Sequence, residues 1–190
     1  MQRVLADSNI LASRTLTDWL FHLRRCNEAM FSVYWTRDIQ VETARVMRKR
    51  NPQWSGQAIE RRLCMLEDVV DEMITYPEGS YAFTGQDEHD FHVHAAAVYG
   101  RANYLLTSNQ EKDFTTRAEE EEYEVIAPDS FFLLVAKSNA TGFHEAVKGQ
   151  YEYYSKPGRC PSLTEPLQKA GCTEFAVAVK SALQRIAQHE

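Results

Sequence analysis

The chain of 190 residues contains few cysteines, no long hydrophobic run and no glycine-rich loop of the kind that binds nucleotide phosphates. The four cysteines form no C-x-x-C pair and lie far apart, at Cys26, Cys64, Cys160 and Cys172. This spacing argues against a zinc knuckle or a redox motif and favours reduced thiols. The lack of a phosphate-binding glycine loop and of a G-x-S-x-G turn also argues against nucleoside-triphosphate chemistry and against an α/β-hydrolase.

Membrane insertion and secretion are not expected either. Uninterrupted apolar sequence reaches only from Phe131 to Ala136, which is too short to cross a bilayer. Asp7 interrupts the first apolar residues before they reach the length of a signal peptide, so we expect a cytoplasmic protein. The formal net charge of −6 is unusual for a nucleic-acid binder. Part of it is concentrated in the solvated run Glu119–Glu122, so local basic patches are a better guide than net charge.

Strand-like and helix-like segments alternate from the start of the chain to about residue 137. Strands are expected at 3–6, 31–35, 103–107 and 123–127, and helices at 15–26, 37–50, 55–74, 87–100 and 128–135. Because strands alternate with helices, the pattern predicts a mainly parallel sheet covered by helices. In such folds the functional sites gather beyond the carboxyl ends of the strands.

The residues after about 137 are predicted to be helical throughout. Asn139–Gly142 has the composition of a junction, and helices are expected near 142–154, at 165–170 and at 173–188. This segment is too short to bury a core alone. We therefore expect a domain at 1–137 and a helical extension at 138–190 that packs on it.

Three acidic residues stand where apolar residues are expected. Asp7 directly follows the first strand, and Glu42 and Asp90 each lie on the apolar stripe of a predicted helix. Taken singly, each has an ordinary explanation as a turn residue, a misphased helix position or a first-turn acid favoured by the helix dipole. Together they predict a divalent cation, because several buried carboxylates repel one another unless a cation joins them. A cation held in this way could polarise a phosphodiester and activate water, as in metal-dependent nucleases.

Four segments that contain these acids resemble, in order and spacing, the motifs of PIN-domain ribonucleases. The segments are Ala6–Leu11, Trp35–Glu42, Asp87–Ala97 and Leu106–Phe114. The resemblance covers residues 2–137 and implies a PIN-like three-layer α/β/α sandwich with a central, mainly parallel sheet. It also implies hydrolysis of RNA phosphodiesters that depends on Mg²⁺ or Mn²⁺.

The resemblance also assigns roles to individual residues. By position, the catalytic acids would be Asp7, Glu42, Asp90 and Asp113, and the metal ligands would be Asp7, Asp90 and Asp113. Many family members have aspartate where this chain has Asn109, and Asp113 is close enough in sequence to take its place. Residues that support the ligands or touch the substrate would be Asn9, Thr107 and Asn109.

The size of the chain is also typical of VapC-type toxins, which are PIN proteins of bacterial toxin–antitoxin pairs. The segment after residue 138 is similar to that of a toxin subgroup with extra C-terminal helices. This resemblance implies a type II toxin that cuts transfer RNA or ribosomal RNA, a small antitoxin protein as its partner, and a homodimer. The alternative is a non-catalytic PIN-fold module for RNA binding or assembly, in which Asn109 marks a decayed site.

Two further groups of residues have open interpretations. Arg45, Arg48 and Lys49 follow Glu42 and could contact substrate phosphates, or they could form a solvated helix face. The tyrosines and cations near residue 155 could stack on bases or pack the extension against the main domain. These residues are Tyr151, Tyr153, Tyr154, Lys156 and Arg159.

A cluster of histidines suggests metal binding at first sight. His92 and His94 diverge on a helix, and no cysteine or third spaced ligand accompanies His89 and His92. Histidines at the surface or behind the acidic residues are therefore expected. His89 and Asp90 also match the HD pair of phosphohydrolases, but those proteins are all-helical and the strand pattern disagrees.

Overall fold

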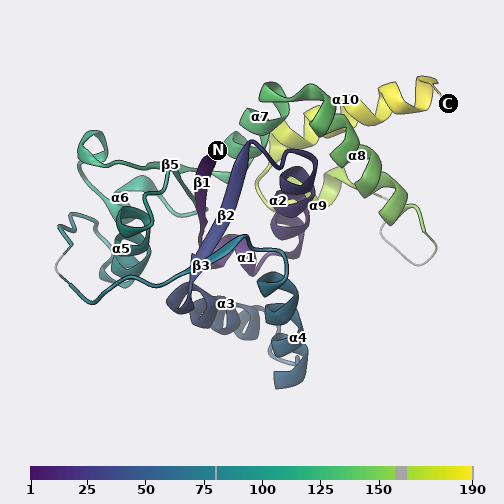
Figure 1. Cartoon of the computed structure of the whole chain (residues 1–190). Helices are drawn as coiled ribbons and strands as arrows, with labels where there is room; N and C mark the ends of the chain where they lie inside the picture. The colour runs from purple at the N-terminus through teal and green to yellow at the C-terminus, as the bar shows by residue number, and fades with distance from the viewer. Residues whose placement is uncertain (80, 157–161, 190) are drawn as a thin grey trace. The chain divides into compact units, whose positions relative to one another are not determined.

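The structure is a computed structural model that describes residues 1–79, 81–156 and 162–189, so the predicted cation Arg159 lies outside the described residues. The chain folds into two compact units (Figure 1). One unit consists of Met1–Ala12 and Met30–Ala127, and the other of Ser13–Ala29 and Pro128–Glu190. The expected boundary at residue 137, and the packing of the extension on the first domain, stay predictions.

The first unit is built around a five-stranded sheet in which neighbouring strands are parallel. The strands lie in the order β3-β2-β1-β4-β5. Their bounds are Gln2–Ala6 for β1, Phe31–Thr36 for β2, Glu72–Ile74 for β3, Tyr104–Leu106 for β4 and Glu124–Ile126 for β5. In the centre, Val4 pairs with Val33 on one side and with Tyr104 on the other. The predicted parallel α/β fold is confirmed.

The central strands are rich in buried residues because both faces of the sheet are covered. All six residues of β2 are buried, and its large side chains Phe31, Tyr34 and Trp35 are among the most fully buried in the protein. A parallel strand between two helical layers has no solvated face, so it lacks the alternation of an antiparallel strand. This is why such short segments could be recognised as buried strands from their composition.

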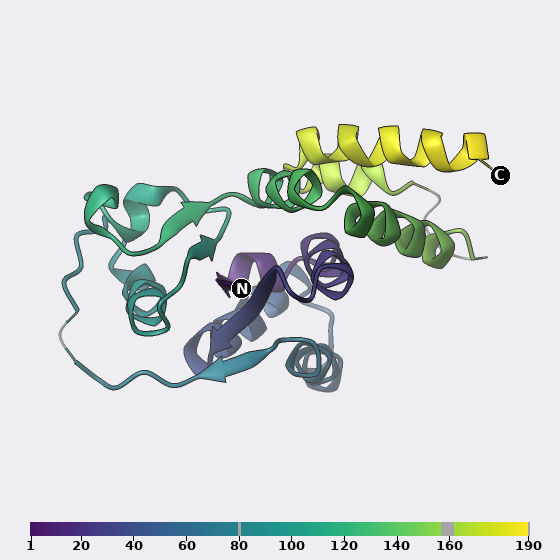
Figure 2. The ribbon, with the colours of Figure 1, turned by 45° about the horizontal axis from the view of Figure 1, so that its top comes forward.

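The helices of this unit connect the strands in two opposite directions. They are α1 (Ser8–Leu11), α3 (Arg37–Arg50), α4 (Gly56–Glu67), η1 (Glu88–Asp90), α5 (Phe91–Tyr99), α6 (Glu111–Phe114) and η2 (Ala118–Glu120). The chain moves outward from β1 through β2 to β3, and then returns past β1 to β4 and β5. Right-handed crossovers that run in opposite directions place their helices on opposite faces of the sheet, which gives three layers (Figure 2).

One predicted helix is shorter than its apolar pattern suggested. The helix expected to reach residue 74 ends at Glu67, and Glu72–Ile74 forms the edge strand β3. The cause is Asp71, whose carboxylate accepts a 2.7 Å hydrogen bond from Val33 N, while its own N–H donates to the Val33 carbonyl at 2.9 Å. These two bonds hold the chain beside β2, where the next residues pair with the sheet. The apolar residues Met73 and Ile74 are compatible with both a helical and a strand pattern.

The second unit is helical and has an aromatic core. Its helices are α2 (Arg14–Cys26), α7 (Pro128–Ser138), α8 (Ala140–Tyr154), α9 (Thr164–Lys169) and α10 (Thr173–His189). The ring of Phe175 lies 5.1 Å from Trp19, 5.2 Å from Phe132 and 5.7 Å from Phe143, centroid to centroid. These contacts join α2 to helices that are more than a hundred residues later in the sequence. Among the described residues, no helix is long and apolar enough to cross a membrane.

Candidate active site

Asp7 lies at the carboxyl end of the central strand, and its carboxylate accepts several hydrogen bonds. The residue is 2% exposed, follows β1 directly and caps α1 by accepting from Ser8 N. Its Oδ2 also accepts from Asn9 Nδ2 at 2.6 Å and from Thr107 Oγ1 at 2.7 Å. Thr107 follows β4, which pairs with β1, so two adjacent strand ends supply this arrangement.

A chain of amide groups extends from Asp7 to Asp90. Asn9 Nδ2 lies 2.9 Å from Thr107 Oγ1 and 3.3 Å from Asn109 Oδ1. Asn109 Nδ2 then donates to Asp90 Oδ2 at 3.1 Å. The structure thus brings together all three residues expected to support the acids. It also gives Asn109 a defined function, because an amide can donate to Asp90 whereas an aspartate in its place would repel it.

Glu42 forms an ion pair with a histidine. It is half-buried on α3, and its Oε2 lies 3.3 Å from His92 Nε2. His92 Nδ1 lies 2.8 Å from the carbonyl oxygen of His89, so this nitrogen carries a proton. Both ring nitrogens can therefore donate when His92 is protonated, one to a carbonyl and one to Glu42.

The sequence had not predicted the pairing of His92 with Glu42. We had expected the three histidines to lie at the surface or behind the acids. Among them, His94 is buried and its Nδ1 lies 2.8 Å from the Tyr123 hydroxyl. His92 lies two residues after Asp90, a spacing that diverges on a regular helix, but the 3₁₀ turn η1 ends at Asp90 before α5 begins. The contact joins α5 to α3, and no local sequence pattern indicates it.

The acids share one electrostatic environment and differ in their tendency to ionise. Burial raises the pKa of Asp90 to about 6, and the negative charges of Asp7, Asp87 and Glu42 add to the effect, while the bond from Asn109 opposes it. The pKa of Asp7 is also raised, mainly by burial and further by Glu42, although its hydrogen-bond donors oppose the shift. These two acids thus lack a positive charge that would stabilise their ionised forms.

Glu42 is different because its partner supplies that charge. The hydrogen bond from His92 is the largest cause that lowers the pKa of Glu42, and the charge of Arg45 lowers it further, against the effect of burial. Burial by itself lowers the pKa of His92, but the Glu42 carboxylate outweighs it and the net shift is upward. The contact therefore favours the ionised form of both partners.

Asp113, which we had expected among the ligands, lies in a different environment. Its carboxylate accepts a 2.9 Å hydrogen bond from Gln110 N and so caps the short helix α6. In the part of the chain that the structure describes, Asp113 is not among the charges that shift the pKa of Asp7, Glu42 or Asp90, whereas those three acids affect one another. Hydrogen bonds through Asn9 and Asn109 link Asp7 to Asp90, and Glu42 acts electrostatically on both, whereas Asp113 caps a helix.

The donor chemistry of the site fits a hard divalent cation. Mg²⁺ and Mn²⁺ prefer carboxylate oxygens, and Mg²⁺ keeps several waters besides one or two protein ligands. Asp7 and Asp90 are buried and negatively charged when ionised, and the charge of Asp7 contributes to the raised pKa of Asp90. Across residues 1–79, 81–156 and 162–189, no three His, Cys, Asp or Glu side chains are already gathered closely enough to surround an ion. The site therefore matches such a cation in the type of its ligands and in its negative charge, and not, among the described residues, in a preformed coordination geometry.

The three predicted RNA-binding cations are exposed on α3 but are not equivalent. Arg45 lies within electrostatic reach of Glu42, and Lys49 lies one turn further along the helix. The guanidinium of Arg48 donates to the backbone carbonyl of Trp54. In the second unit, Tyr151 and Tyr153 are exposed, whereas the hydroxyl of Tyr154 donates to Asp18 at 2.9 Å.

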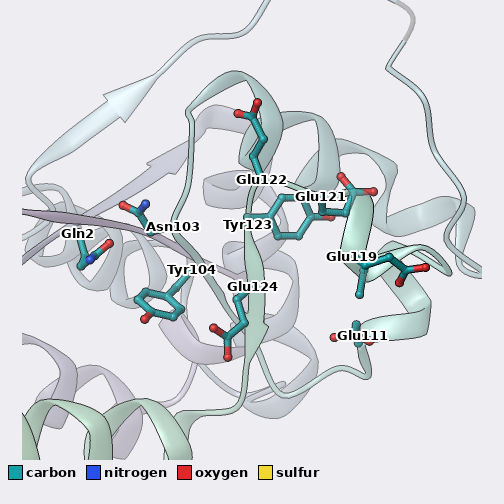
Figure 3. A pocket seen from close by; sticks show the side chains of 10 residues that line it. Gln2, Asn103, Tyr104, Glu111, Glu119, Glu121, Glu122, Tyr123 and Glu124 are labelled. Atoms are coloured by element: carbon teal, nitrogen blue, oxygen red, sulfur yellow. The ribbon is translucent and has the colours of Figure 1, made fainter.

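A hollow of about 510 Å³ lies at the other end of the strands and not at the acids (Figure 3). Gln2, Tyr104 and Glu124 begin β1, β4 and β5, so the hollow is at the amino ends. Its lining is strongly acidic and also includes Asn103, Glu111, Ala118, Glu119, Glu121, Glu122 and Tyr123. The glutamate run that was expected to be simply solvated thus borders a hollow in the surface, away from Asp7 and Asp90.

The fold and the acidic site define an α/β protein of the nuclease type, with acids at the carboxyl edge of a parallel sheet. The family profile of the PIN domain matches residues 3–111, and the chain belongs to this family. The match includes Asp7, Glu42, Asp90 and Asn109, and it ends two residues before Asp113. No curated protein and no solved structure matches the chain.

The raised pKa of Asp90 makes a prediction for the stability of the cation-free protein. An acid whose pKa is higher in the folded state loses its proton first in the unfolded state, so the free energy of unfolding falls as pH rises from about 4 to 6. Asp90→Asn removes the titrating group and with it this fall in the free energy of unfolding. With chelator at about pH 8, we expect the variant to be more stable than the wild type by about 1 kcal/mol. Below about pH 4 the two should be equally stable.

Urea unfolding at the two pH values measures this difference. Asp113→Asn is a matched control, because Asp113 caps α6 through Gln110 N, asparagine caps equally well, and Asp113 is not among the charges that raise the pKa of Asp90. An Asp90→Asn variant that is less stable than the wild type at pH 8 would contradict the electrostatic account.

Proposed function

We propose that the protein is an endoribonuclease that depends on Mg²⁺ or Mn²⁺. The observation that carries this proposal is the pair Asp7 and Asp90, two buried acids with raised pKa values that an amide network joins at the carboxyl edge of the sheet. Buried carboxylates without a compensating charge are unfavourable, and a cation compensates them. The family to which the chain belongs has a nuclease-type fold, which supports the same reading.

Each residue of the site would have a distinct role in binding the cation or in positioning its ligands. Asp7 and Asp90 would hold the cation, while Asn9, Thr107 and Asn109 fix the two carboxylates in position through their hydrogen bonds. Glu42, kept ionised by His92 Nε2, would provide the third carboxylate beside them. When bound, the cation supplies a Lewis acid for the phosphodiester and lowers the pKa of a water molecule. Asp113 caps α6 through Gln110 N and takes no part in the described hydrogen bonds that link Asp7 to Asp90, so we place it last among the proposed ligands.

Incubation with total RNA tests the nuclease proposal. We expect cleavage with Mg²⁺ or Mn²⁺, no cleavage with chelator, and recovery when the cation is restored in excess. The family resemblance implies 5′-phosphate ends, which ligation of an adaptor without prior phosphorylation would detect. Cleavage that persists in chelator would show that the acids do not act through a cation. RNA binding without any cleavage would instead favour a non-catalytic RNA-binding or assembly module.

We further propose that the nuclease is the toxin of a type II toxin–antitoxin pair, acting in the cytoplasm on transfer RNA or ribosomal RNA. Support comes from the size of the chain and from helices after residue 138, as in one toxin subgroup. The partner would be a small antitoxin that covers the site, and the toxin would be a homodimer. A small reading frame beside the gene, whose product relieves growth arrest, is the expected result. Growth unaffected by expression of an RNA-cleaving protein would count against the toxin role alone.

A further inference from the structure

We propose that α3 and the loop after it form a binding track for single-stranded RNA, in which Trp54 stacks on a base and Arg45 and Lys49 contact phosphates. The track begins beside Glu42 and leads away from the acidic site. This inference rests on the proposed function, because it specifies single-stranded RNA as the substrate of the acidic site. No role was predicted for Trp54 from the sequence.

Trp54 is an exposed aromatic residue on a fixed loop. Its side chain is 41% exposed, whereas the other two tryptophans, Trp19 and Trp35, are 3% and 1% exposed. The loop after α3 is held by a 3.1 Å bond from Trp54 N to the Asn51 carbonyl and by the Arg48 guanidinium on the Trp54 carbonyl. The loop is thus fixed and the side chain is kept at the surface, where a large aromatic ring is available for stacking.

Unpaired cations lead from the acidic site toward this ring. Glu42, Arg45 and Lys49 are at positions i, i+3 and i+7 of α3, so they share one face of the helix. At 1.5 Å per residue, Lys49 lies about 10 Å along the helix axis from Glu42. Within the described part of the chain, Arg45, Lys49 and Arg50 make no ion pair with a carboxylate. In a protein with net charge −6, this group of cations would attract an RNA backbone locally.

Arg48 has a positioning role that separates it from the other two cations. Its guanidinium is engaged with the Trp54 carbonyl, so it fixes the loop and is less available to phosphates. The ring of Trp54 favours single-stranded over double-stranded RNA. An indole can stack on a base only if that base is free of its own stack, which holds in single strands and loops and not inside a duplex. An acidic protein could pair with Arg45 and Lys49 but would offer no base for Trp54 to stack on.

Tryptophan fluorescence of the full chain tests the track without any cleavage. In chelator, oligouridine is expected to quench the emission, since Trp54 is the exposed one of the three tryptophans. Trp54→Ala should weaken oligouridine binding about five- to a hundredfold, the effect of losing one stacked base. Trp54→Phe should keep the affinity within about threefold while abolishing the quenching. Arg45→Gln and Lys49→Gln should each reduce the slope of log K against log salt by about 0.7.

The controls separate stacking from charge. Tyr99→Ala removes another exposed aromatic residue from the same unit and should leave binding unchanged. Heparin, an anion without bases, should bind more weakly to Arg45→Gln but should not quench Trp54. Quenching by heparin or polyglutamate as strong as by oligouridine would overturn the proposal, and so would equal binding of duplex RNA. Since the wild type itself reports the quenching, the outcome does not depend on whether a variant folds.

The track and the proposed function fail in distinguishable ways. If the wild type cleaves RNA with Mg²⁺ but Trp54→Ala binds oligouridine normally, the track is wrong and the nuclease stands. If oligouridine quenches Trp54 but no cation supports cleavage, the track stands and the nuclease is wrong.

Discussion

Replacing Asp7 by asparagine is expected to lower cation-dependent RNA cleavage about a thousandfold or more. The carboxylate accepts from Ser8 N, Asn9 Nδ2 and Thr107 Oγ1, so it is held in one orientation at the carboxyl end of β1. Asparagine removes the charge that would bind the cation and turns an N–H₂ group toward those donors. A thousandfold loss corresponds to about 4 kcal/mol of transition-state stabilisation, which is the scale of a metal contribution.

Asp113→Asn is the matched control for this experiment. Its carboxylate caps α6 through Gln110 N, and asparagine can accept the same bond, so we expect cleavage to change by less than about threefold. Single-turnover cleavage rates at saturating Mg²⁺ measure both variants, with circular dichroism to confirm folding. Asp7→Asn that keeps a tenth of the wild-type rate would remove Asp7 from the metal site. Asp113→Asn that is as inactive as Asp7→Asn would show that Asp113 reaches the cation.

Replacing Phe175 by alanine is expected to produce the largest loss of stability, about 3–5 kcal/mol in the free energy of unfolding of the helical unit. The ring is fully buried and lies within 5.1–5.7 Å of Trp19, Phe132 and Phe143, which belong to three other helices. Alanine would leave a cavity at the point where these helices meet. The neighbouring side chains lie on three separate helices and cannot all move to fill it.

Val177→Ala is the control for this change because it lies on the same helix, α10, and its side chain is 63% exposed. We expect it to alter the free energy of unfolding by less than about 0.5 kcal/mol. Urea unfolding followed by circular dichroism and by Trp19 fluorescence measures the helical unit. A loss below about 1 kcal/mol for Phe175→Ala would mean that the aromatic cluster is not the core of this unit.

Much of the fold could be predicted because its central strands are buried on both faces. The segments around Val4, Val33 and Leu105 are short and rich in apolar residues, and helical segments separate them. The edge strand β3 could not be predicted in the same way. Met73 and Ile74 continue the apolar period of α4, and only the bonds between Asp71 and Val33, distant in sequence, place them in the sheet.

The candidate site shows the same division between local and distant information. Asp7, Glu42 and Asp90 could be selected because each is a charge in an apolar pattern, and the parallel topology brings them to one edge. The pairing of Glu42 with His92 could not be selected, since it depends on how α3 and α5 face each other. The cap formed by Asp113 is local, but its sequence pattern is equally compatible with a metal ligand.

The helical unit is assembled from two segments that are far apart in the chain, and this affects the order in which the protein can fold during synthesis. Leu16, Trp19, Leu20 and Leu23 of α2 are buried in the finished protein, yet this helix leaves the ribosome before any other helix of its unit. Its aromatic partner on α10 is made about 150 residues later. Until α7, α8 and α10 have been made, the apolar face of α2 lacks its partners within this unit, and a chain that is released early keeps that face exposed to aggregation.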